Sequence, residues 1–451
     1  MRFLPLALAA LLLAGCFGSS TTPTTSSSPT AAQAQPLAFS PTVIVDKTRI
    51  ASEPSVKVGK DGTLFISAPT GSVKYATRPQ DVAVEGDRGF LQSAIWVSRD
   101  NGTSWTFAQM GALPYHSPLP GAGDSDLAID SAGTIFMADQ LGLADEVVST
   151  SHDNGASWQA ASPLGSGLPD VDRMWLWPDP QQAGIAYMDY DHNEVGLNVA
   201  KTTDDGKTWT AVQAAGDSTA PGPIVATDKV VAFSYETGRD LNFVRSQDKG
   251  LTWTVGAIAK DHDVGGFVDL FPQTFADRAG NLYVAWMEAG NTTDGKPGTA
   301  VAYSVSMDAG TTWSPKHVPF VLPGAGLFLW GAAGSDGRIG FTWYESPDKD
   351  KYYEHAGIVL DAHGGASIAS DVRVDGSPSL PYPPCQNGVG CTQGRELGDF
   401  QQCAIGPDGK LVAAFVVVDA ENGNQGHVAF AKLVQGPSLF APGETLTPWV
   451  V

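Results

Sequence analysis

Acidic side chains recur at two kinds of position along this chain of 451 residues. Clustered carboxylates focus a negative field and bind polar ligands or hard cations such as Ca²⁺. The alternative is that these groups accept backbone N–H bonds or are solvated, and the residues alone leave both interpretations open. One set lies at the start of short apolar segments, namely Glu53, Asp124, Asp126, Asp172, Asp269 and Asp399. The other lies where the next apolar segments end, namely Asp139, Asp189, Asp191, Glu236, Glu288, Glu345 and Asp419.

Motifs of several large enzyme classes are absent from the sequence. There is no CxxC or Cys/His metal spacing, no HExxH and no GxSxG, so zincin and α/β-hydrolase chemistry lack the residues that they require. The chain carries 27 Lys and Arg against 48 Asp and Glu, a formal charge of −21. Binding to a phosphate backbone needs a basic surface, so nucleic acid is excluded as a partner.

The elements that position these acids are expected to be strands. Gly (51), Pro (31) and Trp (12) are abundant while charged residues reach only 17%, a composition that indicates an all-β fold rich in turns. One octapeptide, Ser/Thr-x-Asp-x-Gly-x-x-Trp, occurs at residues 98–105, 151–158, 202–209, 246–253 and 306–313. Its Asp can accept N–H bonds across a tight turn, its Gly can take a positive φ, and its Trp can pack on the sheet. The five Asp residues are Asp100, Asp153, Asp204, Asp248 and Asp308.

A second repeat consists of a Gly-containing turn followed by alternating apolar residues, which is typical of a hairpin entering a strand. It occurs at residues 60–66, 131–137, 278–284, 335–341 and 407–413, with weaker versions at 182–187 and 227–233. Together the repeats define seven units, which begin near Pro54, Asp124, Asp172, Gly222, Asp269, Leu329 and Asp399. This spacing is compatible with four-stranded propeller blades.

The octapeptide resembles the Asp-box (BNR) repeat of the sialidase superfamily. The resemblance implies a β-propeller of four-stranded blades, with seven blades expected and six as the alternative. It places each Asp box in the turn between the third and fourth strands, on the face opposite the mouth that both acidic sets would surround. The last unit lacks an outer strand, and we expect residues 38–45 to supply it and to close the ring.

Sialidases of this superfamily use three arginines for the sugar carboxylate, an acid/base Asp, and a Tyr activated by a Glu. The family's Arg-Ile-Pro opening aligns best with Ser52-Glu53-Pro54, where the arginine is replaced. Tyr235-Glu236 and Tyr344-Glu345 supply the Tyr and Glu types, but adjacent residues on a strand point to opposite faces. The resemblance is thus strong for fold and weak for catalysis. Other arginines expected on the mouth are Arg88, Arg173, Arg239 and Arg395.

The site candidates follow from these expected positions on the mouth. For catalysis they are Arg173, Arg239, Arg395, Tyr344 and Glu345, and for ligand binding they are Asp172, Arg173, Glu236, Glu288 and Glu345. The mouth is also expected to be aromatic, because rings near the strand ends can stack on sugars or form blade core; these are Trp175, Trp177, Trp286, Trp343, Tyr344 and Tyr352. No cofactor is expected to be required, and Ca²⁺ is a candidate ligand of the carboxylates.

The N-terminus predicts export. Arg2 precedes an apolar run over residues 3–13, which suits the h-region of a signal peptide. The following Leu13-Ala14-Gly15-Cys16 resembles a lipoprotein lipobox, which implies cleavage before Cys16 and acylation of its thiol; an ordinary signal peptide is the alternative. Residues 16–38 have the Ser/Thr/Pro-rich composition of a flexible tether. The expected organisation is a leader at 1–15, this tether, one propeller at 39–435 and a tail at 436–451.

Three further cysteines occur late in the sequence. Cys385 and Cys391 are expected to form a disulfide that closes a Pro/Gly-rich loop, leaving Cys403 buried and free.

Three functions are compatible with these features. The leading hypothesis is a monomeric propeller, lipid-anchored at the extracellular face of the membrane, which binds a glycan or another polar ligand at its mouth. The alternatives are an exo-acting glycoside hydrolase of sialidase type and a scaffold that binds other proteins.

Overall fold

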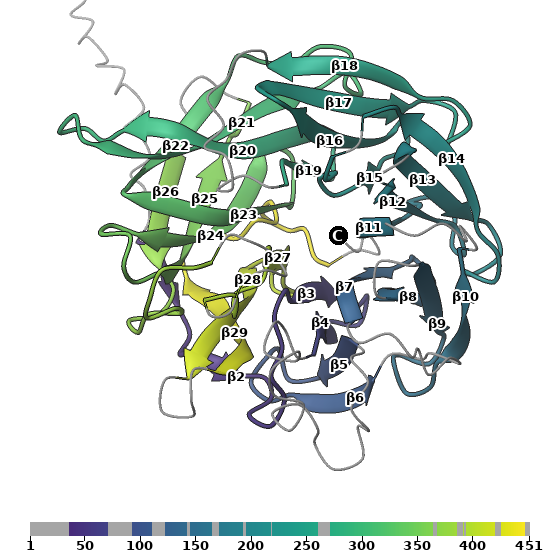
Figure 1. The fold of residues 1–451 in the computed structure, drawn as a ribbon, viewed down its shortest axis with the longest axis horizontal. Coiled ribbons are helices and arrows are strands. Elements are labelled where there is room, and N and C mark those ends of the chain that lie inside the picture. Colours follow the sequence, from purple (N-terminus) through teal and green to yellow (C-terminus); the bar gives the residue numbers. More distant parts are fainter. Residues whose placement is uncertain are drawn as a thin grey trace, which may run out of the picture. The chain divides into compact units, whose positions relative to one another are not determined.

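A computed structural model describes residues 36–70, 93–110, 122–141, 145–164, 171–192, 195–217, 219–259, 271–363, 368–385, 391, 394–419 and 425–446. Residues 34–451 form one compact unit. Every regular element in the described residues is a β-strand, and the strands form seven antiparallel sheets that are arranged as blades around a centre (Figure 1). The predicted all-β, seven-bladed propeller is confirmed, and the six-bladed alternative is not.

Each blade contains consecutive strands, with the first innermost. Blade 1 is β3 (Ser55–Val58), β4 (Leu64–Pro69), β5 (Ser93–Ser98) and β6 (Thr106–Met110), and blade 2 is β7 (Ala122–Ile129), β8 (Ile135–Leu141), β9 (Glu146–Ser151) and β10 (Gln159–Pro163). Blade 3 is β11 (Val171–Pro178), β12 (Ala186–His192), β13 (Gly196–Thr202) and β14 (Thr210–Ala215), and blade 4 is β15 (Val225–Ala226), β16 (Val231–Thr237), β17 (Asp240–Ser246) and β18 (Thr254–Ala259). Blade 5 is β19 (Gln273–Ala276), β20 (Leu282–Asn291), β21 (Pro297–Ser306) and β22 (His317–Pro323), and blade 6 is β23 (Ala325–Ala333), β24 (Arg338–Ser346), β25 (Tyr353–Leu360) and β26 (Ile368–Arg373).

Blade 7 combines the two ends of the propeller sequence. It consists of β27 (Gln402–Ile405), β28 (Leu411–Asp419) and β29 (Gln425–Gln435), with β1 (Ala38–Phe39) and β2 (Val43–Ile44) paired to β29. Ala38 pairs with Gln435 and Val43 with Phe430, so the N-terminal strands supply the missing outer strand (Figure 1). This confirms the predicted closure of the ring, which removes an exposed strand edge.

The Asp-box turns share one hydrogen-bond pattern. In the box of blade 5, the Asp308 carboxylate accepts the backbone N–H of Thr312 (2.8 Å) and the hydroxyls of Thr312 (2.7 Å) and Ser306 (2.8 Å). The Ser306 hydroxyl in turn accepts the N–H of Gly310 (2.8 Å). The same set recurs around Asp100, Asp153, Asp204 and Asp248. The seventh position is Ser or Thr in all five boxes, a regularity that the sequence pattern had left as any residue.

Each box also packs on the preceding blade. A Cβ placed on Gly155 of blade 2 would lie 3.2 Å from the ring of Phe65 in blade 1. In blade 1 the same contact closes the ring, because a Cβ on Gly102 would lie only 1.9 Å from Phe430 in blade 7. Gly therefore serves here for close packing as well as for its positive φ.

The C-terminal segment packs on the propeller. Leu439 is fully buried, its N–H donates to Gly409 O (2.7 Å), and its carbonyl accepts the N–H of Ser335 (2.8 Å). Arg278 stacks over the ring of Phe440 at 4.0 Å. These partners belong to the turns between the first and second strands of blades 5, 6 and 7, on the face opposite the mouth, and the yellow segment runs toward the centre of the ring (Figure 1). The part of the expected tail that is described, 436–446, is thus an integral part of the fold.

The cysteines are placed near the ring's closure. Cys385 and Cys391 form a disulfide. Cys403 lies on the innermost strand β27, buried and with a free thiol. Burial raises the pKa of that thiol to about 12, which keeps it protonated and unreactive.

Candidate functional site

The mouth is the face on which each innermost strand begins and each second strand ends. On this face β11 contains a bulge, because Asp172 pairs with Asp191 and Trp175 with Asp189, leaving one residue extra on β11. Arg173 lies in this bulge with φ 61°, a left-handed conformation that is unfavourable for a residue with a side chain. Glu53 (φ 53°) and Phe328 (φ 54°) have the same conformation at or before the innermost strands of blades 1 and 6. Backbone strain of this kind is common where a functional side chain must be held in one direction.

Arg173 crosses the mouth and joins blades that are distant in sequence. Its Nη1 lies 3.1 Å from Asp124 Oδ2 of blade 2, and its Nη2 lies 2.7 Å from Asp399 Oδ2 at the start of blade 7. Its Nε lies 3.6 Å from Asp172 Oδ2. The side chains of Arg173 and Asp172 are 18% and 30% exposed, so both are partly accessible.

Arg395 is a second arginine that contacts Asp399. It forms an ion pair with both carboxylate oxygens of Asp399, and its Nη2 lies 3.9 Å from Glu53 Oε1. The same Glu53 oxygen accepts the N–H of Asp399 (2.7 Å). Both arginines are therefore neutralised by carboxylates, and we refer to Glu53, Asp124, Asp172, Arg173, Arg395 and Asp399 as the mouth network.

The carboxyl groups of the mouth network differ in pKa. Burial raises the pKa of Glu53 well above its usual value, and the charges of Asp124 and Asp399 add to this. Burial also raises the pKa of Asp124, to about 6, although Arg173 opposes the shift. For Asp399 burial is outweighed by the charges of Arg173 and Arg395, so its pKa lies below the usual value. The pKa values of Glu53 and Asp399 are thus shifted in opposite directions.

Further acids lie at the junction of blades 2 and 3. Glu146 on β9 is fully buried, and neither of its carboxylate oxygens has a hydrogen-bond partner among the described residues. Burial, with the charges of Asp172 and Asp124, raises its pKa well above the usual value. Gln140 links the two blades, because its amide accepts the N–H of Asp124 (3.1 Å) and donates to Asp172 Oδ1 (3.0 Å). Sequence reasoning missed Glu146, which starts the third strand β9, and Gln140, which follows Asp139 near the end of the second strand β8 but is not an acid.

Aromatic rings fill the centre below the mouth network. The ring of Trp175 lies 5.4 Å from Phe271, 5.0 Å from Trp330 and 4.8 Å from Phe400, and its Nε1 donates to Pro221 O (3.0 Å). Trp175 is fully buried, so it forms core and offers no platform for a sugar. The guanidinium of Arg173 lies 5.1 Å from the centre of the Phe271 ring, which supports it from below.

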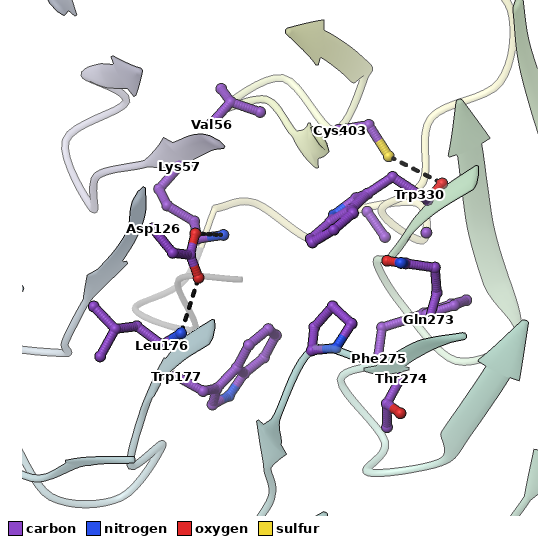
Figure 2. A pocket seen from close by; sticks show the side chains of 13 residues that line it. Val56, Lys57, Asp126, Leu176, Trp177, Gln273, Thr274, Phe275, Trp330 and Cys403 are labelled. Carbon is purple, nitrogen blue, oxygen red and sulfur yellow. Dashed lines mark hydrogen bonds and ion pairs between the residues drawn. The ribbon is translucent and has the colours of Figure 1, made fainter. Parts of the chain in front are cut away.

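A small cavity lies on the axis, below these rings. It has a volume of about 30 Å³, enough for about two water molecules. Figure 2 shows Lys57 and Asp126 on one side and Trp330 and Gln273 across from them. Lys57 Nζ lies 2.9 Å from Gln402 Oε1 and 3.3 Å from Asp126 Oδ1, so the cavity wall is a network that joins blades 1, 2 and 7. Its volume excludes a sugar-sized ligand.

A larger hollow of about 410 Å³ lies between the hairpins of blades 5 and 6. Its charged residues include Asp294 and Lys296, which pair with each other at 2.7 Å and are 56% and 78% exposed. No buried polar group from the lining points to a ligand here, so the mouth network remains the candidate site.

Two of the predicted ligand-binding residues accept hydrogen bonds from the indole N–H groups of tryptophans. Glu288 accepts the indole N–H of Trp286 (2.9 Å) and pairs with Lys316, and Glu345 accepts that of Trp343 (3.3 Å). Trp286 and Trp343 are fully buried, so they are blade core. His355 Nδ1 lies 3.2 Å from Glu345 Oε2, and burial raises the pKa of Glu345 to about 7. The repeated Trp-x-Glu spacing is the signal that could have identified this role.

The two Tyr-Glu pairs do not act jointly. Tyr344 is buried, and its hydroxyl oxygen accepts the N–H of Val416 in blade 7 (2.8 Å), whereas Glu345 bonds Trp343 on the opposite face of β24. Tyr235 donates to Asp217 (2.5 Å), and burial raises the pKa of its neighbour Glu236 to about 8. Arg239 is exposed in the turn between β16 and β17. Of the predicted site residues, Asp172, Arg173 and Arg395 meet in the mouth network.

Several expected residues lie outside the described part of the chain. They are Cys16, Arg88 and Asp269. Asp139 accepts the hydroxyl of Ser93 from blade 1 (2.8 Å), so it acts between blades, and Asp189 is buried in blade 3.

One group of side chains resembles a metal site. Asp277, Asp336 and His363 bring one ligand atom each within 4.8 Å of one another. However, Asp277 already accepts five hydrogen bonds, from the N–H groups of Ala279, Asn281 and Gly337, the amide of Asn281 and the hydroxyl of Tyr283. A carboxylate whose acceptor sites are all used stabilises the turn of blade 5 and fits a cation poorly.

Among the described residues, no helix has the length and hydropathy to cross a membrane.

Comparisons with known proteins support the fold alone. No family model and no curated protein sequence matches the chain. A protein of unknown function from Dyadobacter fermentans superimposes with a TM-score of 0.52 at 16% identity, covering 89% of this chain and 99% of the other. An α-L-arabinofuranosidase from Fusarium graminearum gives a TM-score of 0.46 at 14% identity, covering 89% and 97%. A sialidase from Streptococcus pneumoniae gives 0.44 at 14% identity, covering 88% and 70%.

Proposed function

We propose that this protein is an Asp-box propeller that binds a glycan or a similar polyhydroxylated ligand at its mouth. In this proposal the chain is a monomeric lipoprotein, anchored through Cys16 at the extracellular face of the membrane. The observation that carries the proposal is the bulge in β11, which fixes the partly exposed side chains of Asp172 and Arg173 at the mouth.

The chemistry of this pair suits sugar hydroxyls. A carboxylate accepts and a guanidinium donates hydrogen bonds in fixed directions, while each hydroxyl of a sugar both donates and accepts. Pre-organisation by the bulge and by Asp124 and Asp399 lowers the entropy lost on binding. Both arginines of the mouth network are already paired with carboxylates, which favours a binding protein over an enzyme that captures a sugar carboxylate with free arginines.

A glycan array probed with the full-length protein in detergent tests the proposal. The wild type is expected to bind a defined set of glycans, and Arg173→Ala is expected to lower affinity for them by about tenfold or more, because a charge-assisted hydrogen bond is lost. Asp228→Asn, in the exposed turn between β15 and β16, is the control and should bind as wild type. Unchanged binding by Arg173→Ala would place the ligand elsewhere.

A glycoside hydrolase is the second candidate, and it is favoured by the opposite directions in which the pKa values of Glu53 (raised) and Asp399 (lowered) are shifted. A protonated and an ionised carboxyl group in one site are the pair that glycoside hydrolysis requires. A panel of fluorogenic glycosides distinguishes the two functions. Turnover that disappears in both Glu53→Gln and Asp399→Asn would identify an enzyme, and the absence of turnover with any glycan that the array detects would identify a binding protein.

Membrane attachment is tested separately. Cys16→Ser is expected to prevent acylation and to release the protein from the membrane fraction, measured by fractionation and by mass spectrometry of the N-terminal peptide. Retention of the unacylated variant would mean that another feature anchors the chain.

A further inference from the structure

Two aspartates face each other across the strands of the mouth. Asp172 on β11 and Asp191 on β12 are direct cross-strand partners. Like charges in this position are destabilising, and the Arg173 guanidinium beside Asp172 is shared with Asp124 and Asp399, so the pairing needs an explanation. Sequence reasoning placed both residues on the mouth but gave no reason to pair them.

The two carboxylates are incompletely satisfied. Asp172 Oδ1 accepts the amide of Gln140 (3.0 Å) and the N–H of Arg173 (3.0 Å), but among the described residues its Oδ2 has only the Nε of Arg173, at 3.6 Å. Asp191 is 6% exposed, and its Oδ1 has no hydrogen-bond partner in the described residues. A buried acceptor without a donor costs stability, which a ligand that brings a donor can recover.

We propose that Asp172 and Asp191 bind the ammonium group of the ligand, so that the glycan recognised at the mouth contains an amino sugar. This inference rests on the proposed function and specifies the class of its ligand. An ammonium group is a compact charge with three N–H donors, so it can offer separate donors to Asp191 Oδ1 and Asp172 Oδ2, which belong to paired residues. Both Nη groups of Arg173 pair with Asp124 and Asp399, and its contact with Asp172 Oδ2, through Nε at 3.6 Å, is a long one that a ligand can add to.

A metal ion fits this place less well than an ammonium group. Ca²⁺ requires six to eight oxygen ligands. Among the described residues, three His, Cys, Asp or Glu ligand atoms come within 4.8 Å of one another only at Asp277, Asp336 and His363, so no third carboxylate joins Asp172 and Asp191. The formal charge of −21 also attracts a cationic ligand at long range.

Isothermal titration calorimetry on the full-length protein at pH 7 tests the inference with two matched sugars. A tetramer of β-1,4-linked glucosamine is expected to bind at least about tenfold more tightly than its fully N-acetylated counterpart. Asp172→Asn and Asp191→Asn should each reduce this preference to about twofold or less, because the ion pair is lost. Asp228→Asn removes the same charge from the opposite face and should keep the preference.

The outcomes separate the inference from the proposed function. Equal or tighter binding of the N-acetylated tetramer, or a preference that survives in Asp191→Asn, would overturn the amino-sugar site while leaving a glycan-binding protein. Binding of spermine with the affinity and the variant dependence of the glucosamine tetramer would also overturn it, since the sugar would then contribute nothing. Failure to bind any glycan on the array would instead refute the proposed function.

Discussion

Carboxyl groups in this protein occupy two environments that shift their pKa values in opposite directions. In the Asp boxes, hydrogen bonds from Ser104 lower the pKa of Asp100 to about 2. At the mouth and between the blades, burial raises the pKa of Asp139 and of Asp191 to about 7, with the charge of Asp172 adding to the shift of Asp191. The Asp boxes stabilise the ionised form, and burial at Asp139 and Asp191 stabilises the protonated form.

The buried acids predict that stability falls as pH rises. Because the pKa of Asp139 is raised to about 7 in the folded state, its favourable contribution is complete below the unfolded value of about 4 and is lost as pH rises through about 7. Asp139→Asn cannot ionise, so above pH 7 it should be more stable than wild type by up to roughly 4 kcal/mol. Urea unfolding between pH 5 and 8 measures this difference.

The comparison of wild type with Asp139→Asn needs a control variant in which no buried group is changed. Asp228→Asn alters an exposed acid and should follow the wild-type pH dependence. An Asp139→Asn variant with the same slope of stability against pH as wild type would show that this carboxyl group is ionised in the folded protein.

At the scale of elements, the Asp-box turn depends on a side chain that the sequence motif did not specify. Thr312 Oγ1 donates to Asp308 Oδ2 at 2.7 Å, while its N–H donates to Oδ1. The pKa of Asp308 is lowered to about 2 by the N–H and hydroxyl bonds from Thr312, which shows that the turn favours the ionised carboxylate. Both groups of the seventh residue therefore hold the turn closed.

Thr312→Val removes the hydroxyl and keeps the shape and the N–H. It is expected to destabilise the protein by roughly 0.5–1 kcal/mol, because one exposed hydrogen bond is lost. Ligand binding should be unchanged, since the box lies opposite the mouth. Thr210→Val, on the exposed outer strand β14, is the matched control; a variant at Thr312 as stable as this control would contradict the proposed role of the hydroxyl.

At the scale of the whole molecule, both ends of the described chain secure the ring. The N-terminal strands complete blade 7, as Ser40 N–H donates to Lys432 O (2.8 Å) and Val45 N–H to Val428 O (2.9 Å). The C-terminal segment joins the turns of blades 5, 6 and 7 through Ser335, Arg278 and Gly409. Closure is therefore made twice, once at the outer edge and once on the face opposite the mouth.

Leu439→Ala tests the second of these closures. Leu439 is fully buried against the main core, so the truncation is expected to cost about 2–5 kcal/mol in urea unfolding. Val434→Ala, at a residue that is 55% exposed, should change stability by less than about 0.5 kcal/mol. Equal stabilities of the two variants would mean that the segment is detached in solution.

The fold was predictable where its determinants are local. An Asp box holds its turn with residues of one octapeptide, so Asp100 and its counterparts identify the blades directly. The site was less predictable, because its geometry arises between blades. Nothing near Arg173 in sequence indicates that a bulge aims it at Asp399, more than 200 residues away, or that Gln140 holds Asp172. For Glu288 and Glu345 the sequence analysis overlooked a local signal, the Trp-x-Glu spacing, by which each accepts the indole N–H of Trp286 or Trp343.

The packing of each Asp-box glycine on the preceding blade sets an order of assembly. The chain is synthesised from its N-terminus, so Phe65 is present before Gly155, which packs on it. In the same way Phe136 is present before Gly206. Blade 1 is the exception, because Gly102 must wait for Phe430 and the strands at residues 38–44 must wait for β29. The nascent protein is thus an open arc with one unpaired edge until its last strand is synthesised. A protease or a second unfinished chain has access to that edge only during this interval.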